Sequence, residues 1–225
     1  MPNSSPAEQT CRLYIISPDS IPDVPAFAKI LEETLAAGDV ACFQLRLKNS
    51  DNATIIAAAN ELLPVCHCYN VAFILNDHPK LAAKLGCDGV HIGADDAPYG
   101  EARQAIGNGI VGVTCKDSRH VAMGLADAGA DYVAFGAFFP TTTKVDTAHP
   151  SPEVLSIWSE TTTVPCVAIG GITVENCEIL VRSGADFLAV CSGVWSFTDG
   201  PADAVRAFNT VFERCAILKR REKKN

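Results

Sequence analysis

The segment Cys42 to Asn49, CFQLRLKN, alternates between apolar and polar side chains. Successive side chains of a β-strand point to opposite faces, so Gln44, Arg46 and Lys48 share one face. Helix-like segments flank this strand on both sides, which is typical of a parallel sheet that is buried on both faces. Two cations on the inner face of such a strand would suit an anionic ligand if their end of the strand opens to solvent.

Other charged side chains follow other apolar runs. With Arg46 and Lys48, the third cation is Lys144, and the carboxylates are Asp77 and Asp96. Together they suggest a polyanion that is bound jointly by side chains and a metal ion. Carboxylates without a suitably spaced Cys or His favour Mg²⁺, which commonly takes a few carboxylates plus phosphate oxygens. The alternative is that each Asp caps the helix that follows it, since Asp is a favoured N-cap.

The elements that must position these residues alternate along the whole chain. We predict eight strands, over residues 12–17, 40–47, 71–75, 88–92, 109–114, 131–136, 164–170 and 186–190, each followed by a helical pattern. Three of the helices end before a glycine that suits a left-handed helix terminus, at Gly38, Gly129 and Gly184. The pattern predicts an α/β fold of the (β/α)8 TIM barrel type, with a doubly wound open sheet as the less favoured alternative.

A barrel places its active site at the carboxyl ends of the strands. Arg46 and Lys48 lie at such an end, so we expect them to face the mouth of the barrel. Glycines after the seventh and eighth predicted strands would let the main chain approach a phosphate closely. Two phosphorylated ligands in one mouth are therefore expected, although tight turns alone would also account for these glycines.

The composition excludes some classes of protein. The chain has 225 residues and a net charge of −8, which argues against a nucleic-acid surface. Its start lacks the pattern of a secretory signal and no window approaches the apolar length of a membrane span, so a cytoplasmic protein is expected. The ten cysteines are expected to be reduced, and the spacing of Cys66 and Cys68 is poor for zinc.

We expect a single domain over residues 1–225, with a short polar N-terminal extension and a basic, solvated tail from Lys219 to Lys224. Barrels of this size often associate through their outer helices, so a homodimer is possible, but no helix shows a diagnostic apolar seam.

The motifs at the predicted strand ends resemble those of the thiamine phosphate synthase family, over roughly Leu13 to Trp195. The matching residues are Gln44, Arg46 and Lys48; Asn76 and Asp77; Val90 to Gly93 with Asp96; Thr141, Thr143 and Lys144; Ile169 to Ile172; and Ser192. The resemblance implies transfer of a hydroxymethylpyrimidine group from its diphosphate to a thiazole phosphate, with release of pyrophosphate.

The same resemblance implies a role for each matching residue. Asp77 and Asp96 would hold Mg²⁺, and Arg46, Lys48 and Lys144 would be catalytic. The remaining residues would bind the two small-molecule substrates: Gln44, Asn76 and Thr114 on the pyrimidine side, and Thr141, Thr143, Gly171, Cys191 and Ser192 on the thiazole side. The chain departs from the family at Thr114, where Ser is usual, at Ala94, where Gln is usual, and at Ala137, where Pro is usual.

Two other functions remain open at this point. A thiazole tautomerase of the same fold would need neither metal carboxylates nor three cations, so their presence disfavours it. His91 and His120 are the imidazoles that could act as its base, although His91 ends a predicted strand and is more often structural there. A non-catalytic sensor of thiazole phosphate would retain the same binding residues.

Overall fold

The computed structural model describes residues 11–93, 97–140 and 149–222. Eight parallel strands form a closed barrel in sequence order, and β1 pairs with β8 to complete it. The strands are β1 (Arg12–Ile16), β2 (Val40–Leu45), β3 (Ala72–Asn76), β4 (Gly89–Ile92), β5 (Ile110–Lys116), β6 (Tyr132–Gly136), β7 (Cys166–Ile169) and β8 (Phe187–Val190). The predicted (β/α)8 barrel is confirmed.

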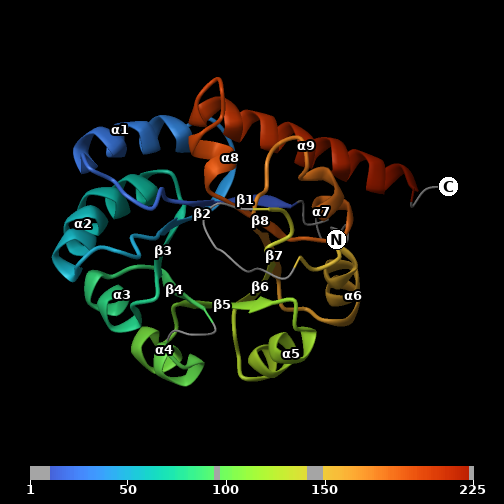
Figure 1. Ribbon diagram of the computed structural model, residues 1–225, viewed down its shortest axis with the longest axis horizontal. Helices are drawn as coiled ribbons and strands as arrows, with labels where there is room; N and C mark the ends of the chain where they lie inside the picture. Colours follow the sequence, from blue (N-terminus) through green and yellow to red (C-terminus); the bar gives the residue numbers. More distant parts are fainter. Residues whose placement is uncertain (1–10, 94–96, 141–148, 223–225) are drawn as a thin grey trace, which may run out of the picture.

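Helices surround the barrel (Figure 1). They are α1 (Val24–Leu35), α2 (Asn52–Cys68), α3 (Pro79–Leu85), α4 (Tyr99–Ile106), α5 (Arg119–Asp127), α6 (Glu153–Thr161), α7 (Glu178–Arg182), α8 (Ser192–Trp195) and α9 (Pro201–Glu222). α8 is one short turn between β8 and α9. α9 ends at Glu222, so the backbone of the predicted tail is helical from Lys219 to that residue; the predicted N-terminal extension lies outside the described residues.

Polar side chains begin several of these helices. Asp23 accepts a hydrogen bond from the backbone N–H of Ala26 at the start of α1, and Asp51 does the same for Thr54 at the start of α2. Such caps satisfy backbone donors that have no partner within the helix. Within the described residues, no helix is long and apolar enough to cross a membrane.

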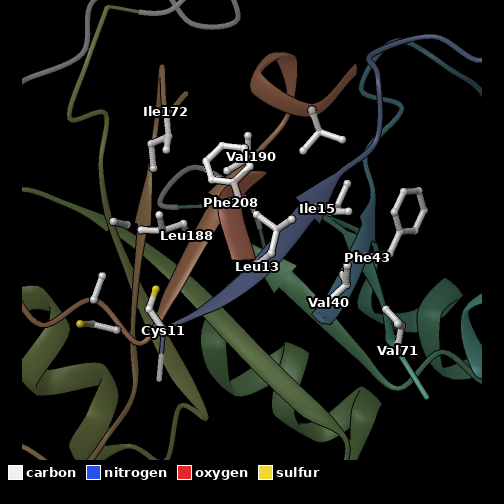
Figure 2. Packing of buried hydrophobic residues seen from close by; sticks show 14 of the residues in the cluster. Cys11, Leu13, Ile15, Val40, Phe43, Val71, Ile172, Leu188, Val190 and Phe208 are labelled. Atoms are coloured by element: carbon white, nitrogen blue, oxygen red, sulfur yellow. The ribbon is translucent and has the colours of Figure 1, made fainter. Parts of the chain in front are cut away.

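The core has two layers, one on each side of the strands. Outward-facing side chains pack against the helices, and Figure 2 shows labelled members of this layer on β1, β2 and β8 together with Phe208 of α9. Inward-facing side chains fill the barrel itself, among them Tyr14, Ile74 and Tyr132. β2 contributes to both layers, with Phe43 outside and Cys42 inside. The alternation along β2 therefore has the predicted directions.

The glycine turns follow the prediction at two of three positions. Gly129 and Gly184 have φ angles of 98° and 97°, in the left-handed region. Gly38 lies outside that region, so the prediction was wrong there. A Cβ at Gly38 would meet Asn209 Oδ1 at 2.9 Å, and the same oxygen accepts from the backbone N–H of Asp39. Close approach to α9, a tertiary contact, is thus the reason for this glycine.

Candidate active site

The predicted site residues that the structure describes lie at the carboxyl ends of the strands. Gln44 belongs to β2, Asn76 ends β3, and Thr114 belongs to β5. The residues that come after the ends of their strands are Arg46, Lys48, Asp77, Gly171, Cys191 and Ser192. β2 ends at Leu45, two residues earlier than predicted, so Arg46 and Lys48 lie in the loop that follows. Asp96, Thr141, Thr143 and Lys144 lie outside the described residues.

Lys48 and Asp77 come together from the segments that follow the neighbouring strands β2 and β3. Lys48 Nζ lies 3.6 Å from Asp77 Oδ2. Both side chains line a pocket of about 310 Å³, together with Asn76, His78 and a wall of apolar side chains from Leu45, Leu47, Ile55, Leu75 and Ala97. The pocket therefore combines a cation, a carboxylate and an amide at the ends of β2 and β3.

Asp77 has an unusual backbone conformation. Its φ angle is 65°, which is uncommon for a residue other than glycine, although Asp and Asn tolerate it best. The N-cap residue of α3 is His78, so Asp77 does not occupy the N-cap position that the alternative interpretation gave it. The backbone N–H of Asp77 donates instead to His91 O at 2.9 Å. This bond ties the end of β3 to β4 and leaves the Asp77 carboxylate beside Lys48.

Arg46 makes an ion pair that the sequence did not reveal. Its Nη1 donates to a carboxylate oxygen of Asp19, in the loop after β1. The Arg46 side chain is 12% exposed and that of Asp19 is 59% exposed. Ser17 joins the two loops, because its Oγ accepts from the backbone N–H of Arg46 at 2.9 Å. Asp19 follows a predicted strand, as the other polar residues do, and this position was the signal that could have found it.

The end of β8 lies beside the same loop. Cys191 Sγ donates to the backbone oxygen of Ser17 at 3.3 Å. Burial raises the pKa of the Cys191 thiol to about 11, and the Asp19 carboxylate adds to this rise while Arg46 opposes it. The thiol is therefore neutral near pH 7 and is a poor nucleophile.

A chain of hydrogen bonds crosses the inside of the barrel. Gln44 Nε2 donates to Tyr14 Oη at 2.7 Å, and Tyr14 Oη lies 2.9 Å from Tyr132 Oη. His91 Nδ1 lies 2.9 Å from Tyr132 Oη, and His91 Nε2 lies 2.8 Å from Thr114 Oγ1. Burial raises the pKa of both tyrosines well above the ordinary value, so both remain neutral.

These hydrogen bonds connect two predicted substrate contacts, Gln44 and Thr114. Both ring nitrogens of His91 are engaged within it, which agrees with the structural role expected for this residue. No sequence pattern indicated the two tyrosines, because each occupies an ordinary core position of a strand. Their pairing depends on how β1 and β6 face each other across the barrel.

The turn after β7 is shaped by contact with the loop after β6. Gly171 has a φ angle of 63°, and a Cβ on it would lie 2.4 Å from Pro140 O. Asn176 Nδ2 donates to the Gly171 oxygen at 2.9 Å. Only a glycine fits this conformation and this approach. Ser192, at the start of α8, is exposed on the adjacent strand end.

The sequence and the fold of this chain are both similar to those of known proteins. Residues 13–194 match a family described as thiamine monophosphate synthase. A thiamine-phosphate synthase of Rhodospirillum centenum is 58% identical over 202 residues, covering 89% of this chain and 97% of the relative. One of Hyphomonas neptunium is 53% identical over 210 residues, covering 91% and 95%.

Among solved structures, a thiamine phosphate pyrophosphorylase from Pyrococcus furiosus aligns with a TM-score of 0.79 at 27% identity. The alignment covers 92% of this chain and 98% of that one. The family match and these relatives favour a synthase over a tautomerase-like isomerase or a sensor. The chain belongs to the thiamine monophosphate synthase family, as the resemblance in its motifs had indicated.

Proposed function

We propose that this chain synthesises thiamine phosphate by joining a pyrimidine and a thiazole at the mouth of the barrel. The C–O bond between the pyrimidine methylene and the diphosphate breaks, and its electron pair leaves with pyrophosphate. The ring nitrogen of the thiazole phosphate supplies the electron pair of the new C–N bond. The observation that carries this proposal is the cluster of Arg46, Lys48 and Asp77 at adjacent strand ends, in a chain of this family.

Cations at this position suit the departing group. Negative charge collects on pyrophosphate as the C–O bond lengthens, and positively charged groups held in place before the reaction lower the barrier. Arg46 and Lys48 supply that charge from the loop after β2, and Lys144 is proposed as the third catalytic cation. Arg46 is largely buried, so its position is set by the fold.

The donor chemistry at the end of β3 fits Mg²⁺. The Asp77 carboxylate lies beside Lys48 in the lining of the pocket, and hard oxygen donors are the ligands that Mg²⁺ prefers. Asp77 and Asp96 would hold the ion. When bound, it would neutralise charge on the diphosphate oxygens. The two carboxylates are then metal ligands and have no part in proton transfer.

The two organic substrates occupy opposite sides of the mouth in this proposal. Gln44, Asn76 and Thr114 bind the pyrimidine, and the hydrogen bonds through Tyr14, Tyr132 and His91 fix the directions of the Gln44 amide and the Thr114 hydroxyl. The thiazole phosphate is bound by Thr141, Thr143, Gly171, Cys191 and Ser192. Orienting the two reactants brings the thiazole nitrogen within reach of the methylene carbon.

No side-chain nucleophile is needed for this reaction. The pyrimidine stabilises the methylene cation by electron donation, so the protein has only to position the substrates and stabilise charge. The high pKa of the Cys191 thiol accords with a binding role for that residue.

Pyrophosphate release tests the proposal. The protein is mixed with Mg²⁺ and the pyrimidine diphosphate, with and without the thiazole phosphate, and pyrophosphate is measured. Thiamine phosphate formation and fast release that require both substrates are expected. Turnover of a thiazole substrate alone would indicate an isomerase, and binding without turnover would indicate a sensor; either result would contradict the proposal.

A further inference from the structure

The ion pair between Asp19 and Arg46 joins two side chains of very different exposure. Arg46 is 12% exposed, whereas Asp19 is 59% exposed. Within the described residues, Asp19 is the side-chain partner of the Arg46 guanidinium. The buried member is therefore fixed by the fold, and the exposed member can move into solvent at little cost.

The pair lies where three strand ends meet. Asp19 follows β1, Arg46 follows β2, and Cys191 at the end of β8 bonds to Ser17 in the Asp19 loop. The backbone of Arg46 is held by Ser17 Oγ independently of Asp19. Loss of the Asp19 charge should thus leave the path of the chain around Arg46 intact.

A carboxylate on a guanidinium resembles a phosphate on the same group. Both anions accept charge-assisted hydrogen bonds from the same N–H donors, so they compete for them. A diphosphate that reaches Arg46 has to share or displace the Asp19 carboxylate, and the two negative charges repel each other.

We propose that Asp19 is a positioning residue that takes the place of the diphosphate on Arg46 whenever the site is empty. It keeps the guanidinium aimed at the mouth, and it weakens the hold on pyrophosphate so that the product leaves readily. The inference rests on the proposed role of Arg46 as a diphosphate-binding residue. It predicts that Asp19 lowers the affinity for pyrophosphate and that this effect is transmitted through Arg46.

Calorimetric binding of inorganic pyrophosphate in the presence of Mg²⁺ tests this. Asp19→Asn, which keeps the size of the side chain, should bind pyrophosphate about two- to fivefold more tightly than wild type, the range of an exposed ion pair. Its kcat should fall where product release limits turnover, and inhibition by pyrophosphate should increase. Asp19→Ser is a second variant that removes the charge with a smaller side chain.

Asp39→Asn is the matched control. Asp39 is 56% exposed and pairs with Arg12, immediately before β2 and therefore at the opposite end of the barrel. The Asp39→Asn substitution removes the same charge from the protein, but far from the mouth. Its affinity for pyrophosphate should equal that of wild type, and equal tightening in both variants would overturn the inference.

The same binding measurement in the Arg46→Ala variant separates this inference from the proposed function. Arg46→Ala should weaken binding, and adding Asp19→Asn to it should have no further effect. Unchanged or weaker binding in Asp19→Asn, or equal tightening with and without Arg46, would overturn the inference alone. Wild-type binding in Arg46→Ala would overturn both it and the diphosphate role of Arg46. Arg46→Gln serves for these comparisons if the alanine variant does not fold.

Discussion

The proposed role of Arg46 can be tested directly by substitution. Arg46→Ala should lower kcat by about a hundredfold or more, because a preorganised group that meets developing charge is lost. Stability should fall by only about 1 kcal/mol, because Asp19 stays in solvent when its partner is lost and the packing of the buried Arg46 stem is the main loss. Arg46→Lys should recover part of the activity, because it keeps the charge without the planar fork.

Steady-state kinetics and urea denaturation measure these effects. Arg12→Ala is the control, because it removes an arginine that pairs with an exposed Asp away from the mouth. Wild-type kcat/KM in Arg46→Lys would contradict bidentate binding by Arg46. A decrease of several kcal/mol in the free energy of unfolding of Arg46→Ala would indicate a structural ion pair instead.

Of the two carboxylates proposed to hold Mg²⁺, Asp77 is the one that lies within the described residues. Asp77→Asn should lower kcat at least about tenfold and raise the Mg²⁺ concentration needed for half-maximal rate, because a charged ligand becomes neutral. Asn tolerates the left-handed backbone of this position, so thermal stability should stay near that of wild type. Full activity of this variant, or of wild type in excess chelator, would contradict a metal role.

At the scale of the elements, the hydrogen bonds inside the barrel depend on close packing between β5 and β6. A Cβ on Gly112 of β5 would lie 1.8 Å from Tyr132 Cζ. Gly112→Ala should therefore displace the Tyr132 ring and break the link between Tyr14 and His91. Tyr132→Phe removes only the hydroxyl, and it should cost about 1–3 kcal/mol of stability because the hydrogen bonds of that hydroxyl to Tyr14 and His91 are lost.

Both variants should raise KM for the pyrimidine diphosphate, because the Gln44 amide and the Thr114 hydroxyl lose their fixed directions. KM for the thiazole phosphate should change much less. Gly124→Ala is the control for glycine replacement, since a Cβ there meets nothing within 4 Å and Ala favours a helix. Equal effects on the two KM values would show that the hydrogen bonds serve stability alone.

The sequence predicted the elements well and their side-chain partners poorly. The alternation along β2 placed Gln44 on the inner face, where it bonds to Tyr14 inside the barrel, because strand periodicity is a local property. The pair of Asp19 and Arg46 and the contact of Tyr14 with Tyr132 join residues from different strands. Such partners are fixed by barrel closure and strand register, which a single sequence does not encode locally.

At the scale of the whole molecule, many buried thiols couple stability to alkaline pH. Burial raises the pKa of Cys115, Cys166 and Cys177 to about 12, from 9.0. Above about pH 9 the unfolded chain loses these protons while the folded protein keeps them, so stability should fall as pH rises. The loss should continue up to about pH 12, where the folded thiols also ionise.

Urea denaturation at about pH 7 and about pH 10.5 measures this dependence. Cys166→Ala should show a smaller decrease between the two pH values than wild type does, because one coupled thiol is absent. The exposed Cys68 provides the control, as Cys68→Ala should leave the decrease unchanged. Equal stability at both pH values would contradict protonated, buried thiols.

The most direct test of the central claim is the stoichiometry of products. Wild-type protein with Mg²⁺ and both substrates should form thiamine phosphate and pyrophosphate in equal amounts, with neither formed when one substrate is omitted. That result follows if the mouth of the barrel couples C–O cleavage to C–N bond formation. Pyrophosphate release that is independent of the thiazole phosphate, or no release with both substrates present, would contradict the account.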